Sequence, residues 1–150
     1  MKGLNLPTYS LKIKSKKGLG YVYDVFRKKY VRLTPEEWVR QNFAHYLVKE
    51  KNYPASRIII EKTLHINRLV KRCDMLVCND KGDPVILIEC KSPEVKISQE
   101  AFEQVAIYNI NFRVEYLLIT NGIKHFFCRV NFITSEVEFL NEIPDYQGIR

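Results

Sequence analysis

Residues 69–91 read LVKRCDMLVCNDKGDPVILIECK, and this stretch decides the fold. Residues 69–78 and 85–91 are rich in apolar and β-branched side chains, which favour β-strands. Between them, residues 79–83 form a polar turn cluster that contains a glycine, and Pro93 closes the second run. The stretch therefore predicts an antiparallel β-hairpin inside a larger sheet.

A turn centred on Lys81–Gly82 sets the register of this hairpin and places Asp74 directly opposite Glu89. Side chains alternate between the two faces of a strand, so each carboxylate shares its face with a basic residue two positions away. The register therefore predicts one charged patch, which consists of Arg72, Asp74, Glu89 and Lys91.

The negative charges of the two carboxylates in this patch need a positive charge nearby to balance them. Two carboxylates about 5 Å apart repel by about 3 kcal/mol at an effective dielectric constant of 20, and charged groups are seldom buried without a partner. A divalent cation such as Mg²⁺, which binds through one or two carboxylates and keeps several waters, would supply it. A buried cluster of ion pairs would do so as well, and the spacing favours neither interpretation.

Two segments carry helix signals. Thr34, Pro35 and Glu37 form a capping box at the start of the first helix, and residues 52–54, which include a proline, end it. Ser98 is the N-cap of a second helix that extends to about residue 109. Both helices have apolar residues at helical spacing and are expected to pack against the sheet.

The remaining segments complete a mixed sheet. We expect residues 141–150, which are polar, to be frayed. The order of elements predicts an α/β (α+β) fold with a mixed central sheet flanked by helices, within a single domain over residues 1–150. Residues 1–33 form an added N-terminal β-hairpin, and residues 34–140 form the core. The further strands are expected at residues 11–14, 21–25, 57–61, 115–120, 124–132 and 136–140.

The charge of the chain is concentrated at its N-terminus. The net charge is +7, and residues 1–33 hold nine basic residues and a single acid, Asp24. A positive end on a near-neutral body suits a polyanion such as nucleic acid, although a solvated basic face would have the same composition. The residues expected to contact nucleic acid are Lys12, Lys14, Lys16 and Lys17.

The cysteines and the apolar runs indicate a cytoplasmic protein. The four cysteines show no CxxC spacing, so a zinc ribbon is disfavoured and buried reduced thiols are expected. Cys73 and Cys90 are predicted to lie opposite each other, away from the carboxylates, where nothing would lower a thiol pKa as a redox protein requires. The sequence has no signal-peptide h-region and no apolar run long enough to span a bilayer.

The charged patch also resembles a known family. Asp74 followed by Glu89-Cys90-Lys91 is similar to the core of the PD-(D/E)xK nucleases, and residues 104–108 resemble the QxxxY element of some branches. A wider set resembles the N-terminal nuclease domain of type I restriction enzyme R subunits, in a stand-alone form. The segments that carry this similarity are LTPEEWVRQ (33–41), KRCD (71–74), ECKSP (89–93), QVAIY (104–108) and TNG (120–122).

The resemblance implies a restriction-endonuclease-like core that hydrolyses DNA phosphodiester bonds. Asp74 and Glu89 would bind Mg²⁺ or Mn²⁺ with the backbone carbonyl of Cys90, and Lys91 would orient or activate the attacking water. Gln104 and Tyr108 would brace the site or contact DNA. Arg72 would contact a DNA phosphate or neutralise Asp74, and the sequence favours neither role.

Two further acids are candidates for metal binding. Nucleases of this kind often use an acidic residue on the first helix as an extra ligand, which makes Glu37 a candidate. Its place in the capping box with Thr34 explains it equally well. Glu61 on the first core strand is a lesser candidate, because a surface salt bridge would also account for it.

The chain departs from the family in two respects. Cys73 stands where the proline of the motif name would precede Asp74, a position that varies widely in the superfamily. No GxxxxGK[ST] loop is present, so ATP-driven translocation is not expected. The expected partners are DNA, other restriction–modification subunits and a second copy of the chain. The alternative function is a catalytically inactive nucleic-acid-binding or assembly module on the same fold.

Overall fold

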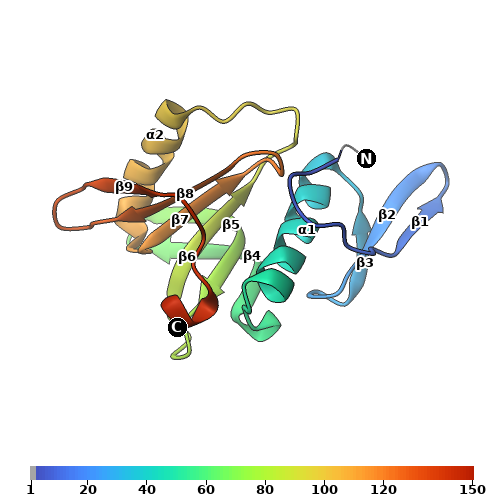
Figure 1. Ribbon diagram of the computed structural model, residues 1–150, viewed down its shortest axis with the longest axis horizontal. Coiled ribbons are helices and arrows are strands. Elements are labelled where there is room, and N and C mark those ends of the chain that lie inside the picture. Colours follow the sequence, from blue (N-terminus) through green and yellow to red (C-terminus); the bar gives the residue numbers. More distant parts are fainter. Residues whose placement is uncertain (1–2) are drawn as a thin grey trace.

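The hairpin predicted from residues 69–91 lies within a six-stranded mixed sheet in the computed structural model (Figure 1). The structure describes residues 3–150, apart from the side chain of Tyr108. The strand order is β4-β5-β6-β7-β8-β9, and only β6 and β7 are parallel. The bounds are β4 (Ile58–Ile66), β5 (Leu69–Cys78), β6 (Pro84–Cys90), β7 (Tyr116–Thr120), β8 (His125–Val130) and β9 (Val137–Leu140).

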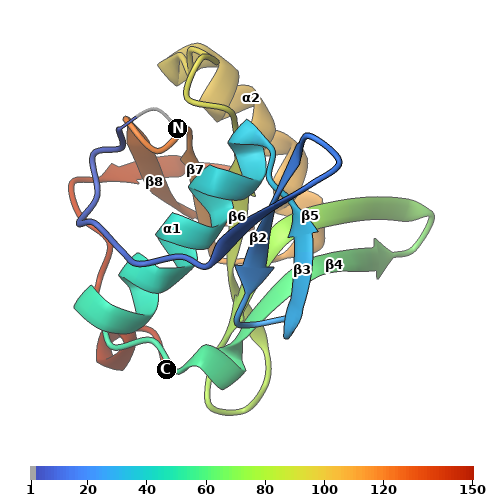
Figure 2. The ribbon, with the colours of Figure 1, turned by 90° about the vertical axis from the view of Figure 1, so that its right-hand side faces the viewer.

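A helix covers each face of this sheet (Figure 2). Helix α1 (Pro35–Glu50) begins at the predicted cap, because the Oγ1 of Thr34 accepts a hydrogen bond from the N–H of Glu37 at 3.1 Å. Helix α2 (Gln99–Asn109) begins in the same way at Ser98 and connects the parallel strands β6 and β7. The predicted α/β fold with a mixed sheet flanked by helices is therefore confirmed. Three short 3-10 helices are Ala55–Arg57, Ile110–Phe112 and Tyr146–Gly148.

The N-terminal segment forms a second, three-stranded antiparallel sheet, on the side of α1 away from the six-stranded sheet (Figure 1). The prediction of a two-stranded hairpin was incomplete here. A turn containing Lys28 at φ 54° reverses the chain after β2, and Asp24 accepts hydrogen bonds from two backbone N–H groups of that turn. The strands are β1 (Ile13–Lys16), β2 (Leu19–Asp24) and β3 (Lys29–Arg32).

The core has two layers, one on each face of the six-stranded sheet. The layer under α1 includes Phe43 and Leu47, and the layer under α2 includes Phe102 and Ala106, all fully buried. No helix among the described residues is long and apolar enough to cross a membrane.

The C-terminal residues belong to the α1 layer, which contradicts the expectation that residues 141–150 are frayed. Ile143, Tyr146 and Ile149 are at most 9% exposed and pack in that layer. The hydroxyl of Tyr146 also donates a hydrogen bond to Asp80 at 2.9 Å. Three apolar side chains in an otherwise polar segment are enough to fold it onto the core.

Strand β5 changes its facing beside Asp74. Cys73 lies in the α2 layer, whereas Met75, two residues later, lies in the α1 layer. On the neighbouring strand, Glu61 has a positive φ of 53° and interrupts the ladder at this level. Regular alternation therefore fails here, and the prediction that Cys73 and Cys90 share a face was wrong, since Cys90 lies in the α1 layer.

Candidate active site

The two central carboxylates meet as the sequence predicts. The ladder between β5 and β6 pairs Met75 with Ile88, so the adjoining position brings Asp74 opposite Glu89. The Oδ2 of Asp74 accepts a hydrogen bond of 2.7 Å from the N–H of Cys90, the last residue of β6. This bond fixes the carboxylate of Asp74 at the carboxyl end of β6.

Lys71, which the predicted charged patch does not include, supplies the basic partner of Glu89. The Nζ of Lys71 forms an ion pair with Oε1 of Glu89, and both side chains are largely buried. Arg72 is mostly exposed, and its Nη2 lies 3.3 Å from Oε1 of Glu61. Strand alternation pointed to the wrong basic neighbour because β5 changes its facing at this level. A contact of Arg72 with DNA stays a prediction.

The environment of Asp74 makes its negative charge costly. Burial raises the pKa of Asp74, and the neighbouring Glu89 raises it further. The N–H of Cys90, the ammonium of Lys91 and the guanidinium of Arg40 oppose these effects, but the pKa still lies above its usual range. A carboxyl perturbed by burial and by a second acid is typical of a functional site.

Lys91 follows directly after β6, and its side chain is exposed. Its N–H donates a hydrogen bond of 2.8 Å to the carbonyl of Thr120 at the end of β7. The backbone of Lys91 is therefore anchored between two core strands, while its ammonium faces solvent within electrostatic reach of Asp74. This arrangement suits a cation that contacts a substrate phosphate.

Glu37 takes part in a different cluster, on helix α1. Its Oε1 lies 2.7 Å from Nη2 of Arg27 and accepts a hydrogen bond of 2.9 Å from Gln41, while Oε2 accepts one of 3.1 Å from Arg40. Burial alone would raise the pKa of Glu37, but the contacts with Arg40, Gln41 and Arg27 lower it. Both oxygens of the Glu37 carboxylate are thus bound by guanidinium groups, those of Arg27 and Arg40. A role for Glu37 as a metal ligand stays a prediction that these contacts do not favour.

Arg40 connects that cluster to the central carboxylates, and the sequence reading missed it. Its Nη2 donates a hydrogen bond of 2.7 Å to the fully buried Asp24, and it lowers the pKa of Asp74. Its Nη1 is buried and has no hydrogen-bond partner among the described residues. The sequence does contain a signal for Arg40, because an arginine in the middle of the apolar stripe of α1 must be buried with a charged partner.

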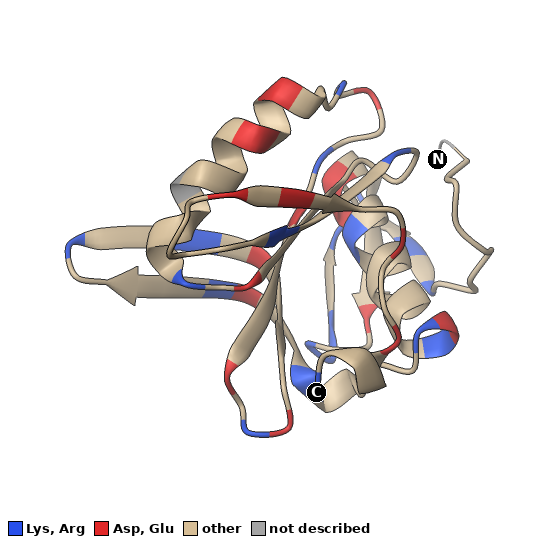
Figure 3. Cartoon of the chain, turned by 60° about the vertical axis from the view of Figure 1, so that its left-hand side comes forward, with Lys and Arg blue, Asp and Glu red and all other residues tan. Residues whose placement is uncertain are grey.

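Glu61 lies at the outer edge of this charge cluster. One oxygen of its carboxylate is 3.0 Å from Nη1 of Arg27, and the other contacts Arg72. Residues of both signs thus lie close together along α1 and the β4–β5 hairpin (Figure 3). Among the described residues, no group of three His, Cys, Asp or Glu side chains is placed to hold a metal ion. Asp74 and Glu89 are a pair, to which neither Glu37 nor Glu61 is added.

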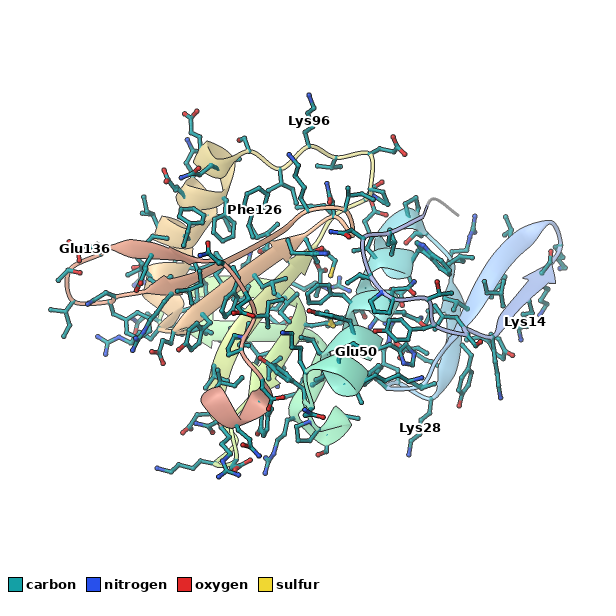
Figure 4. All side chains as sticks on the ribbon, viewed as in Figure 1. Lys14, Lys28, Glu50, Lys96, Phe126 and Glu136 are labelled. Carbon is teal, nitrogen blue, oxygen red and sulfur yellow. The ribbon has the colours of Figure 1, made fainter. Side chains whose placement is uncertain are left out.

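The other predicted site residues occupy three separate positions. Gln104 is exposed on α2, and the side chain of Tyr108 lies outside the described part of the structure. The lysines of the N-terminal sheet are exposed on the far side of α1 from α2, where Figure 4 labels Lys14. These lysines are Lys12, Lys14 and Lys16, in or just before the first strand, and Lys17 in the turn that follows. The roles of Gln104, Tyr108 and these lysines stay predictions.

The cysteines lie in the two core layers. All four are free and buried. Burial raises the pKa of Cys73 to about 11 and that of Cys128 to about 12, and it raises the pKa of Cys78 and Cys90 as well. The expectation of buried thiols is confirmed, and a raised pKa leaves less of the reactive thiolate.

Comparison with known proteins identifies one family and one solved structure that this chain resembles. Residues 35–144 match the family described as type I restriction enzyme R protein N terminus. Among solved structures, the chain resembles a fragment described as an HsdR subunit of a type I restriction enzyme from Vibrio vulnificus YJ016, with a TM-score of 0.51 and 19% identity. The match covers 77% of this chain and 24% of that one, so this chain spans about a quarter of its relative. No curated protein matches.

Proposed function

The chain belongs to the family of type I restriction enzyme R protein N-terminal domains, and from this premise we propose that it is a metal-dependent DNA endonuclease domain linked to restriction–modification. The observation that carries the proposal is the placement of Asp74, Glu89 and Lys91 together at the carboxyl end of β6. Residues at the carboxyl ends of neighbouring parallel strands often form sites in α/β folds, and β6 and β7 are such a pair.

The donor set fits Mg²⁺ or Mn²⁺. Asp74 and Glu89 offer carboxylate oxygens, and Cys90, which directly follows Glu89 in the chain, offers a backbone carbonyl. Hard cations prefer such oxygen ligands. The raised pKa of Asp74 and the ammonium of Lys71 on Glu89 both indicate that this pair stabilises a positive charge. When bound, the cation would neutralise charge on the phosphate and lower the pKa of water.

Three side chains around the carboxylates would have separate roles in the proposed reaction. The exposed ammonium of Lys91 would hold a phosphate oxygen and orient the attacking water. Arg40 would keep Asp74 ionised from the α1 side, because its guanidinium lowers the pKa of Asp74. Gln104 on α2 would brace the site when DNA is bound.

DNA and other restriction–modification subunits are the proposed partners. The chain spans only about a quarter of the HsdR fragment that it resembles, so the remaining functions of such an enzyme would come from other parts or subunits. The basic lysines of β1 and its turn would add affinity that does not depend on DNA sequence.

A cleavage assay tests this proposal. Supercoiled and linear DNA are incubated with the purified chain in Mg²⁺ or Mn²⁺, and the wild type is compared with Asp74→Ala and Lys91→Ala. We expect the wild type to cut and each variant to lose at least about a hundredfold in rate, as for groups that act on the transition state.

The control is Lys81→Ala, an exposed lysine in the β5–β6 turn, which should cut as the wild type does. Circular dichroism checks that each variant is folded. If the wild type and both site variants behave alike, the nuclease proposal is overturned. A wild type that binds DNA without cutting it, alone or with partner subunits, favours the inactive binding module instead.

A further inference from the structure

The N-terminal sheet presents one face that is rich in lysine and tyrosine. The register pairs Lys14 with Tyr21, and Tyr21 with Arg32, while Tyr23 pairs with Tyr30 in the next row. Paired residues point to the same face of a sheet, so these side chains lie together. The cross-strand rows are completed by Lys12 beside Tyr23 and by Lys16 beside Leu19. We call this surface the Lys/Tyr face: Lys12, Lys14, Lys16, Tyr21, Tyr23, Tyr30 and Arg32.

The opposite face of the same sheet is turned towards the protein. Val22 and Asp24 alternate with the tyrosines of β2, and both are fully buried. Asp24, the only acid in residues 1–33, is bound there by Arg27 and Arg40. The four cations of the Lys/Tyr face therefore have no acid of their own segment to neutralise them. In the part of the chain that the structure describes, none of the four forms an ion pair.

Lys14 in β1 and Lys12 just before that strand lean across tyrosine rings. The Nζ of Lys14 lies 3.7 Å from the centroid of the Tyr30 ring, and that of Lys12 lies 6.0 Å from the centroid of the Tyr23 ring. The rings of Tyr23 and Tyr30 are themselves in edge-to-face contact, with centroids 5.2 Å apart. These contacts restrict the lysine side chains and hold their charges in fixed positions. Figure 4 shows Lys14 on this outer sheet.

We propose that the Lys/Tyr face binds the phosphate backbone of duplex DNA, with Lys12, Lys14 and Lys16 following successive phosphates of one strand. Residues two apart on a strand are separated by about 6.8 Å, which is close to the spacing of neighbouring phosphates. The tyrosines position the lysines and do not stack on bases, because the Tyr30 ring already carries the ammonium of Lys14. Single-strand binding would instead need free ring faces.

This inference deepens the proposed function, because it assigns the surface that would hold the DNA substrate. It concerns a segment outside residues 35–144, the part of the chain that matches the family. It is tested by binding in EDTA, which does not depend on cleavage. The same protein preparation is assayed separately for cleavage in Mn²⁺.

The binding test uses a fluorescein-labelled duplex and one of its single strands, with fluorescence anisotropy measured over a series of salt concentrations. The first variant carries Lys12→Gln, Lys14→Gln and Lys16→Gln. We expect the slope of log affinity against log salt for the duplex to fall by about 2.7, because three phosphate contacts are lost. A matched control carries Lys49→Gln, Lys51→Gln and Lys81→Gln and should keep the wild-type slope.

A second pair of variants tests the role of the ring. Tyr30→Leu should weaken duplex binding about two- to fivefold with the slope unchanged, since the charges remain but Lys14 loses its support. Tyr30→Phe keeps the ring and should bind as the wild type does. Circular dichroism and melting of both variants establish that the sheet is intact.

Three results would overturn the inference. The first is a wild type that does not bind the duplex in EDTA, and the second is an unchanged slope in the triple lysine variant. The third is a loss confined to the single strand in Tyr30→Leu, which would make the face a platform for bases. Cleavage that persists in any of these cases leaves the proposed function standing, whereas intact binding with no cleavage removes the nuclease and retains the face.

Discussion

The ammonium of Lys71 pairs with the carboxylate of Glu89 across neighbouring strands, beside a second acid, Asp74. Lys71 therefore occupies one oxygen of the proposed cation site. A divalent cation that uses Glu89 must share or displace this ammonium. The ion pair would keep the acidic pair stable without metal and reduce the net affinity for metal.

Replacing Lys71 should increase the stabilisation that metal provides. We expect Lys71→Met to melt at a lower temperature than the wild type in EDTA, because it leaves two neighbouring carboxylates without this cation. Its melting temperature should then rise more on addition of Mn²⁺ than that of the wild type, since at a given concentration a ligand that binds the folded state more tightly stabilises it more. Lys62→Met, an exposed lysine on β4, is the control and should show the wild-type shift. An equal shift in all three proteins would show that Lys71 does not compete with metal.

Neutralising Asp74 should stabilise the metal-free protein at neutral pH. The folded-state pKa of Asp74 is raised, so above that pKa the ionised carboxyl costs stability, and below its unfolded value of 3.8 the cost disappears. Asp74→Asn should therefore melt higher than the wild type at pH 7 in EDTA, by about 2–4 °C for each kcal/mol gained, and the difference should vanish as the pH falls below 3.8. Asp83→Asn, at an exposed turn position, should show no such gain. A lower melting temperature for Asp74→Asn at pH 7 would contradict the account.

Removing Asp24 should have the opposite effect. Burial would raise the pKa of Asp24, but Arg40, Arg27 and two backbone N–H groups lower it, so the ionised form stabilises the fold above its usual pKa of 3.8. Asp24→Ala should reduce the free energy of unfolding in urea at pH 7 by on the order of 3 kcal/mol, since it leaves a buried guanidinium short of a partner. The difference from the wild type should shrink as the pH falls through the lowered pKa. Asp83→Ala provides the comparison, with a change expected within about 0.5 kcal/mol.

The buried C-terminal residues give a prediction about stability. Ile143 is 7% exposed, and its replacement by alanine should reduce the free energy of unfolding by about 2–4 kcal/mol. Ile133 is 95% exposed, and Ile133→Ala should change it by less than about 0.5 kcal/mol. Urea denaturation of the two variants measures both effects. Equal, small effects would mean that residues 141–150 do not belong to the core in solution.

The sequence predicted those parts of the fold that depend on local signals. The hairpin of residues 69–91, its register over residues 75–77 and both helix caps followed from turn residues, β-branched runs and capping chemistry, and the structure confirms them. The register shift that pairs Cys78 with Pro84 was not predicted. The third strand, Lys29–Arg32, was missed because its basic residues resemble a solvated loop until a partner strand is known.

The charged neighbours of the site depend on tertiary structure and were harder to predict. Strand alternation assigned Arg72 to the carboxylates, but β5 changes its facing between Cys73 and Met75, and Lys71 takes that place. Arg40 reaches the site from α1, at a distance in sequence that no spacing rule covers. Periodicity describes a regular strand, and the site lies where the strand is irregular.

The ion cluster on α1 makes the outer sheet a fixed part of the molecule. Asp24 in β2 is held by Arg40 on α1, and Arg27 in the following turn reaches Glu61 on β4. A duplex lying on the Lys/Tyr face would then meet the carboxylates at a set distance along its length. The proposed nuclease would therefore cut at a constant separation, in base pairs, from the phosphates that the Lys/Tyr face binds.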